Sequence, residues 1–131
     1  MDRKKLLKTL DELCSKYVRM RDNKCILCGG YVGDIKKLQS HHWAVSRARS
    51  LKYRFDERNL VSLCYGCHIL KIHHNPSLLL LDELKNRVLL NGIATQEDIE
   101  EIKASSNIPY KMTITEIENK INYYKGKLNG K

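Results

Sequence analysis

Two Cys-x-x-Cys pairs constrain this chain more than any other feature of its sequence. Cys25 and Cys28 form the first pair, Cys64 and Cys67 form the second, and 35 residues separate the two pairs. Two such pairs can close a tetrahedral site on one zinc ion, and Gly29-Gly30 supplies a backbone that turns tightly after the first pair. A closed site of four cysteines leaves the ion no open position, so we predict a structural zinc that holds the fold and does no chemistry.

Disulfide bonds are the alternative use of these cysteines. The chain has no apolar stretch long enough to cross a bilayer, and its opening residues 1–5 are not followed by a secretory apolar segment. We therefore expect a cytoplasmic protein (in the host cytoplasm if the chain is viral) with no membrane partner, a setting that favours zinc over disulfides. The fifth cysteine, Cys14, lies on an apolar helix stripe and is interpreted as a core residue.

The positive charge of the chain is confined to its first half. The formal net charge is +9; residues 1–71 hold 16 Lys and Arg against 7 Asp and Glu, whereas residues 72–131 hold 8 against 8. A one-sided positive field attracts polyanions, and nucleic acid is the commonest polyanion inside a cell. Simple solubility is the alternative explanation of this charge.

Hydrophobic periodicity predicts helices at both ends of the chain and an irregular centre. Residues 3 to about 20 have the apolar spacing of an amphipathic helix, and residues 22–63 predict a small ribbon with β-prone pieces at 38–45 and 51–55. Helices are expected at 65–73, before a break at Asn75-Pro76, and then from the caps Ser77, Thr95 and Thr113. We predict one α+β domain over residues 1–131: an N-terminal helix (1–21), a zinc-stapled core (22–75) and a helical extension (76–131).

The histidines are concentrated in one part of the chain. All five, namely His41, His42, His68, His73 and His74, lie between the first cysteine pair and the residues just past the second. Imidazole is the commonest metal ligand and exchanges a proton near neutral pH, so such a cluster beside a basic ribbon indicates metal-assisted hydrolysis. The alternative is that some of these histidines belong to the zinc site or to a surface turn.

Three separated elements, taken in order, resemble the HNH endonuclease motif. They are His41-His42, then Asn59-Leu60-Val61, then Cys64-x-x-Cys67-His68-x-x-Lys71. The resemblance implies a ββα-metal (His-Me finger) core around one divalent ion, with His41 and His68 as metal ligands, His42 as the general base and Asn59 as an orienting residue. Since the residue four positions beyond His68 is Ile72, His73 is the third predicted ligand, one residue beyond the ideal helical spacing.

Nearly the whole chain is similar to one family of HNH enzymes, the NinG (Rap) recombination endonucleases of lambda-like phages. The similarity runs through residues 10–29, through Ser40-His41-His42-Trp43 to residues 53–59, and through the tail from Tyr110. It implies a DNA endonuclease selective for branched recombination intermediates such as Holliday junctions or D-loops. Cutting a junction needs two active sites related by a twofold axis, so we expect a homodimer, formed through the first or last helix.

These residues predict a mechanism of phosphodiester hydrolysis. His42 would take a proton from the attacking water, and a divalent ion, Mg²⁺ by preference or Mn²⁺, would stabilise the leaving 3′ oxygen. Six basic side chains near the motif are predicted to contact DNA phosphates: Arg47, Arg49, Lys52, Arg54, Arg58 and Lys71. Trp43 could stack on a base or fill the core.

Two other functions fit parts of the same pattern. A non-catalytic zinc module that binds DNA would explain the charge and the cysteine pairs, but it gives no reason for the adjacent His41 and His42. A sequence-specific HNH nuclease, of the restriction or homing type, would share the motif, and only the chain-long resemblance favours branched DNA.

Overall fold

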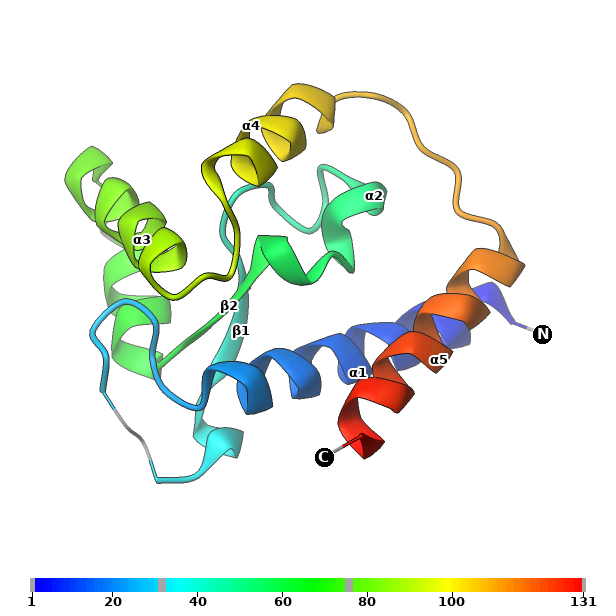
Figure 1. Cartoon of the computed structure of the whole chain (residues 1–131), viewed down its shortest axis with the longest axis horizontal. Coiled ribbons are helices and arrows are strands. Elements are labelled where there is room, and N and C mark those ends of the chain that lie inside the picture. Colours follow the sequence, from blue (N-terminus) through cyan, green and yellow to red (C-terminus); the bar gives the residue numbers. More distant parts are fainter. Residues whose placement is uncertain (1, 31–32, 75–76, 131) are drawn as a thin grey trace.

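The computed structural model describes residues 2–30, 33–74 and 77–130, which form a small α+β fold (Figure 1). Helices of the α type surround a two-stranded ribbon, with two short 3-10 helices (η1 and η2) and one π-helix (η3). In order, the elements are α1 (Arg3–Asp22), η1 (Ile35–Lys37), β1 (Gln39–His42), α2 (Leu51–Arg54), η2 (Glu57–Asn59), β2 (Leu60–Leu63), η3 (Gly66–His73), α3 (Leu78–Leu90), α4 (Gln96–Ser105) and α5 (Ile114–Asn129).

The ribbon lies between the two larger apolar clusters of the described residues, and a smaller third cluster is formed by Val45, Tyr53 and Ile102. β1 and β2 pair antiparallel, with His42 opposite Leu60 and His41 opposite Val61. All of β2 is buried: Leu60 joins the cluster between α1 and α5, whereas Val61 and Leu63 join the cluster around the cysteines. Because directly opposite residues share a face, β1 alternates in the same way, and its two histidines point to opposite sides.

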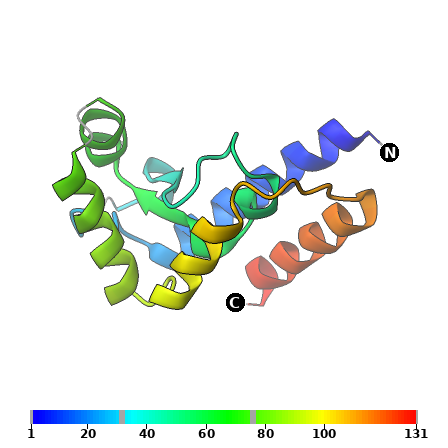
Figure 2. The same cartoon turned by 90° about the horizontal axis from the view of Figure 1, so that it is seen from above.

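α1 and α5 lie side by side in both views (Figures 1 and 2) and close one of these clusters. Its buried side chains on the two helices are Leu10, Cys14, Val18, Ile117, Ile121 and Tyr124. Cys14 is 2% exposed, so its interpretation as a core residue is confirmed. The apolar faces of the first and last helices thus cover each other within the chain.

The second cluster joins the cysteine region to α3 and α4. Leu84 and Val88 of α3 and Ile99 of α4 pack there with Val61 and Leu63 of β2. The caps predicted for these helices are confirmed, since Ser77 caps α3 while Thr95 and Thr113 form complete capping boxes on α4 and α5. The helical extension is thus anchored on the ribbon.

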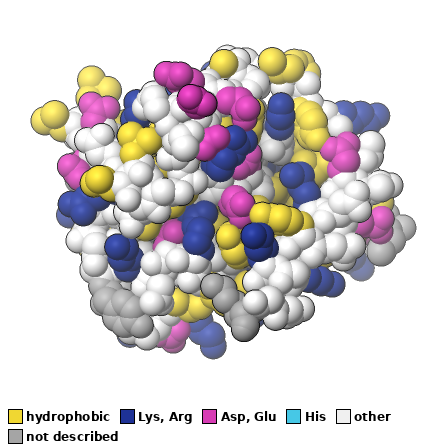
Figure 3. Space-filling view, in the orientation of Figure 1, with side chains coloured by type: hydrophobic (Ala, Val, Ile, Leu, Met, Phe, Trp, Pro, Cys, Tyr) yellow, Lys and Arg dark blue, Asp and Glu magenta, His cyan; other side chains and the backbone are white. Residues whose placement is uncertain are grey.

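α3 also carries apolar side chains that face solvent. Leu78, Leu79 and Leu90 are at least 80% exposed, and apolar side chains protrude at the upper left of Figure 3, over α3. These side chains take no part in either apolar cluster. No described helix combines the length and the apolar character that crossing a bilayer requires.

The prediction of a β-prone piece at residues 51–55 is wrong. Ser50 caps a short helix there (α2), and the second strand of the ribbon is β2. A strand buried on both faces reads as a short apolar run without alternation, so periodicity does not single it out. The predicted helix break at Asn75-Pro76 lies outside the described residues.

Packing between α1 and α5 predicts a large cost for truncation in that cluster. Leu10 is fully buried, so Leu10→Ala should lower the free energy of unfolding by about 2–5 kcal/mol, through lost burial and a residual cavity. The matched control is Leu79→Ala, at a position 83% exposed, where the change should stay within about 0.5 kcal/mol. Urea unfolding followed by circular dichroism measures both, and equal changes would contradict the packing.

Candidate metal centres and the His42 pocket

The four cysteines of the two pairs meet in one cluster. Their sulfur atoms all lie within 4.8 Å of one another, and Cys28 Sγ lies 3.9 Å from Cys64 Sγ. A tetrahedral zinc with bonds of about 2.3 Å holds its sulfur ligands about 3.8 Å apart, whereas a disulfide needs about 2.05 Å. None of the cysteines is disulfide-bonded. The cluster therefore has the donor set and spacing for a structural zinc.

A tight turn brings the first pair into position. Cys25 N–H donates to Gly30 O at 3.0 Å, and Gly29 N–H donates to Cys25 O at 2.8 Å, with Gly29 at a φ of 74°. A Cβ on Gly30 would approach Cys28 Sγ to 3.2 Å, so the turn favours glycine there as well. Burial raises the pKa of Cys28, but the Gly30 N–H bond and the neighbouring thiols outweigh it and leave that pKa below its usual value. Thiolate, the form that binds metal, is favoured at this position.

The three predicted histidine ligands also lie close together. The ring nitrogens of His41, His68 and His73 include a set within 4.8 Å of one another, and Nε2 of His68 lies 3.0 Å from Nε2 of His73. Two imidazole nitrogens on one tetrahedral ion, at about 2.0–2.1 Å each, lie about 3.3 Å apart. His68 Nδ1–H donates to Gln39 Oε1 at 2.7 Å, which leaves the Nε2 lone pair of His68 directed to the shared centre. The triad can hold one divalent ion.

The winding of η3 explains how His73 reaches this triad. An α-helix would bring residue 72 over His68, and an α-helix is what the sequence predicts at 65–73. η3 is instead a π-helix, in which each residue bonds five positions back, as His74 N–H does to Ile69 O at 3.2 Å. The extra residue per turn places His73, five positions beyond His68, on the same face.

Two rings of the histidine triad, those of His41 and His68, favour the neutral form of imidazole because their pKa values are lowered. Burial, together with the nearby rings of His68 and His73, lowers the pKa of His41 to about 3. Burial and the His73 ring also lower the pKa of His68. His73 is exposed, so the centre is open to solvent on that side. The neutral rings of His41 and His68, together with the open side at His73, suit a metal centre that keeps a coordination position for water or substrate.

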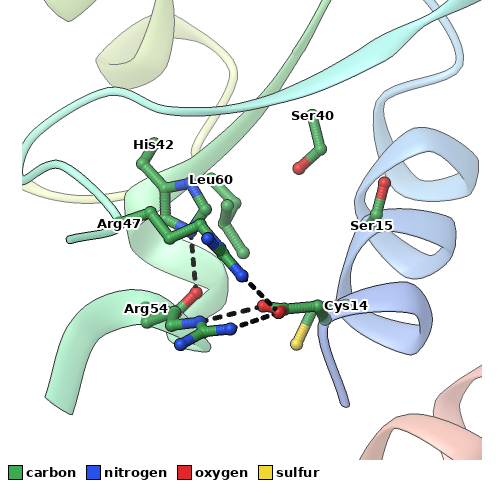
Figure 4. A pocket seen from close by; sticks show the side chains of 8 residues that line it. Cys14, Ser15, Ser40, His42, Arg47, Arg54 and Leu60 are labelled. Atoms are coloured by element: carbon green, nitrogen blue, oxygen red, sulfur yellow. Dashed lines mark hydrogen bonds and ion pairs between the residues drawn. The ribbon is translucent and has the colours of Figure 1, made fainter. Parts of the chain in front are cut away.

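His42 points to the other side of β1, into a separate pocket of about 220 Å³ (Figure 4). Its Nε2–H donates to the Arg54 carbonyl at 2.9 Å, which leaves Nδ1 as the acceptor nitrogen. Burial lowers the pKa of His42, and the bond to Arg54 opposes that shift without cancelling it. The other lining residues come from α1, from the two strands and from the segment that joins β1 to β2: Asp11, Cys14, Ser15, Ser40, Arg47, Arg54 and Leu60.

Asn59 fastens the segment that follows β1. Its side chain is fully buried; Oδ1 accepts from Ala44 N–H and Val45 N–H, each at 2.9 Å, and Nδ2 donates to Val45 O and Tyr53 O. Asn59 thus orients the chain on either side of the His42 pocket, whereas the direct partner of the His42 ring is the Arg54 carbonyl.

The basic side chains predicted to contact DNA differ in the ion pairs and hydrogen bonds that they make within the chain. Arg47 and Arg54 both pair with Asp11, and Arg49 donates to Asn107. Lys52 and Lys71 are exposed. Arg58 pairs with Asp56, Asp98 and Glu101 and so ties η2 to α4. We therefore leave Arg58 out of the proposed phosphate contacts.

Of the two roles considered for Trp43, stacking on a base and filling the core, the structure favours the second. Its side chain is partly buried against the apolar cluster around the cysteines, and its Nε1–H donates to Arg58 O at 2.8 Å.

The sequence did not predict two residues of the sites, Gln39 and Asp11. Gln39 stands two residues before His41 on a strand, so alternation alone would have put both on one face. Nothing local in the sequence links Asp11 with Arg54, which lies 43 positions away.

Comparison of the chain with protein-family models, with curated proteins and with solved structures finds no match. The function proposed below is therefore inferred from the geometry of the two candidate metal centres and the His42 pocket, together with the sequence motifs.

The cysteine cluster predicts one tightly held zinc ion. Protein purified without chelator should contain zinc, and Cys67→Ser should hold one ion fewer per chain and melt at a lower temperature, because metal binding and folding are coupled. Cys14→Ala is the control, since Cys14 lies outside the cluster. Elemental analysis and native mass spectrometry measure the zinc; equal content in Cys67→Ser and the wild type would refute the site.

The bonds of Asn59 predict a second stability effect. Asn59→Ala leaves the N–H groups of Ala44 and Val45 without their partner, at about 1–3 kcal/mol for each group that stays buried. We expect a loss of at least about 2 kcal/mol and faster amide exchange at residues 44 and 45. Asn107→Ala, at an exposed position bonded to Arg49, should change stability by less than about 0.5 kcal/mol.

Proposed function

We propose that the chain is a metal-dependent DNA endonuclease of the HNH type, with β1, β2 and η3 as its ββα-metal core. One observation carries the proposal. His41 and His42 are neighbours on one strand, yet His41 belongs to a cluster of three histidines that could hold a metal ion, and His42 to a pocket that also holds arginines. A phosphodiester lying over the edge of β1 would meet a metal ion from one side and a base from the other.

His42 has the properties of a general base. The Arg54 carbonyl fixes the proton on Nε2, so the Nδ1 lone pair is the one available to a water molecule. Its lowered pKa keeps the ring neutral at neutral pH, which is the form that accepts a proton. His42 Nδ1 would take the proton of the water as its oxygen attacks phosphorus.

His41, His68 and His73 would hold the divalent ion, which when bound supplies positive charge to the phosphate oxygens and to the departing 3′ oxygen. Gln39 would keep the His68 ring in its ligating orientation. Mg²⁺ prefers oxygen ligands, whereas Mn²⁺ and Zn²⁺ accept imidazole more readily. Three nitrogen ligands therefore favour Mn²⁺ over Mg²⁺ as the stronger binder at this centre.

The substrate class rests on the sequence resemblance to the recombination endonucleases. That resemblance supports branched DNA, such as Holliday junctions or D-loops, and a homodimer that brings two such sites to one junction. Arg47 is exposed at the mouth of the His42 pocket and would contact a phosphate beside the one that is cut. Phosphate contacts position DNA without reading its sequence, which suits a nuclease that selects structure.

The test is cleavage of labelled four-way junctions, linear duplexes and single strands, with Mn²⁺, Mg²⁺ or no added ion. The wild type should nick branched DNA only with an added ion, and His42→Ala should be slower by about 10²–10⁴. His74→Ala is the matched control, since His74 belongs to neither site. Omitting the ion is preferable to EDTA, which would also strip the cysteine cluster.

Each other outcome has a definite meaning. Cutting of linear duplex at one sequence would favour a restriction or homing type of nuclease. Binding without cutting, by the wild type and His42→Ala alike, would favour a zinc-containing DNA-binding module and refute the nuclease.

The His73→Ala variant should retain the zinc bound by the cysteines but need more Mn²⁺ to reach its half-maximal cleavage rate.

A further inference from the structure

A second groove runs along α1. It has a volume of about 540 Å³ and is lined by basic side chains of α1 and of the segments that face it. Its lining residues are Asp2, Lys4, Lys5, Leu7, Lys8, Asp11, Arg47 and Arg54. Lys4, Lys5 and Lys8 are exposed, and none of them was among the basic residues that the sequence singled out. We call this feature the α1 groove.

The α1 groove joins the His42 pocket. Asp11, Arg47 and Arg54 line both hollows, so the two meet at these side chains. One stripe of α1 connects them, because Lys4, Lys8, Asp11 and Ser15 follow each other at spacings of three and four residues, and Ser15 lies in the His42 pocket. A DNA strand lying in the groove would therefore reach the ion-paired Asp11, Arg47 and Arg54, which border the His42 pocket.

The charge of the groove is positive. Asp11 is neutralised by Arg47 and Arg54, which together outweigh the effect of burial and lower its pKa. The Asp2 carboxylate accepts the Lys4 backbone N–H at the start of α1. No ion pair within the described residues engages Lys4, Lys5 or Lys8.

We propose that the α1 groove binds the sugar-phosphate backbone of the DNA strand next to the phosphate that is cut. This inference rests on the proposed nuclease function. Lys4 and Lys8 are one helical turn apart, a rise of about 6 Å, so their flexible side chains can reach different phosphates of one strand. Two to three lysines at this spacing can each meet a phosphate while Arg47 meets the one nearest to His42.

The experiment compares two triple variants with the same change of charge. Lys4→Glu/Lys5→Glu/Lys8→Glu reverses the groove, and Lys103→Glu/Lys125→Glu/Lys127→Glu reverses three exposed lysines outside it. Both are made in the His42→Ala chain, which binds without cutting. Fluorescence anisotropy with a labelled four-way junction and a labelled duplex, over a range of KCl concentrations, gives Kd and its salt dependence.

The groove variant should bind at least about tenfold more weakly than the control variant, and its slope of log Kd against log salt should be lower by about 0.9 for each lost contact. Glutamate at positions 4 and 5, in the first turn of α1, favours the helix, and position 8 is exposed, so misfolding is not expected to explain such a loss. Circular dichroism checks this, and Lys4→Ala/Lys5→Ala/Lys8→Ala should show a smaller loss of the same kind.

Three results would overturn the inference. If both triple variants bind alike while His42→Ala abolishes cutting, the groove is not the DNA path although the nuclease stands. If the groove variant loses binding only to phosphatidylserine vesicles, the surface serves a membrane. If the His42→Ala chain binds no DNA, the inference and the nuclease proposal both fail.

Discussion

The burial of β2 on both of its faces is the constraint on which the rest of the structure depends. Leu60 and Ser62 turn toward α1, where Ser62 Oγ donates to Val18 O. Val61 and Leu63 turn toward the apolar cluster around the cysteines. Neither face tolerates a slip of one residue, because a slip would exchange the two sets of side chains. The register of β1 is therefore fixed as well, and with it the side of the ribbon to which each of its two histidines points.

The two candidate metal centres depend on each other through the same strand. Ile26, inside the first cysteine pair, donates its N–H to Ser62 O at 2.9 Å, and the second pair follows the end of β2. An ion on the cysteines would thus tie the turn after the first pair to the start of η3. Since His68 follows Cys67 directly, that ion would also fix where the histidine triad begins. A closed centre that does no chemistry can in this way set the geometry of an open one.

The sequence predicted those features that depend on local chemistry or on ligand spacing. The cysteine cluster follows from its two pairs, and the caps Ser77, Thr95 and Thr113 follow from side chains that bond their own helix ends. The π-helical winding of η3 was not predicted, because its period appears only when the backbone bonds five positions back. Residues 51–55 carry β-prone side chains, but their backbone bonds are made within a helical turn that Ser50 caps. The pairing of Asp11 with Arg54 is a tertiary contact that no local pattern records.

Arg54 shows how the basic residues of this chain differ in use. Its guanidinium holds Asp11 of α1, and its backbone carbonyl holds the ring of His42, so one residue couples the candidate base to the longest helix. The Arg54 side chain is largely buried against Asp11, and Arg58 is held by three carboxylates, so these two charges are less available to a polyanion than that of Arg47, whose side chain is 59% exposed. The excess positive charge of the first half therefore resides largely in side chains without a carboxylate partner, such as Lys4, Lys5 and Lys8. A count of basic residues locates the field in the chain, but only the pairing of the arginines shows which side of the molecule it leaves for a ligand.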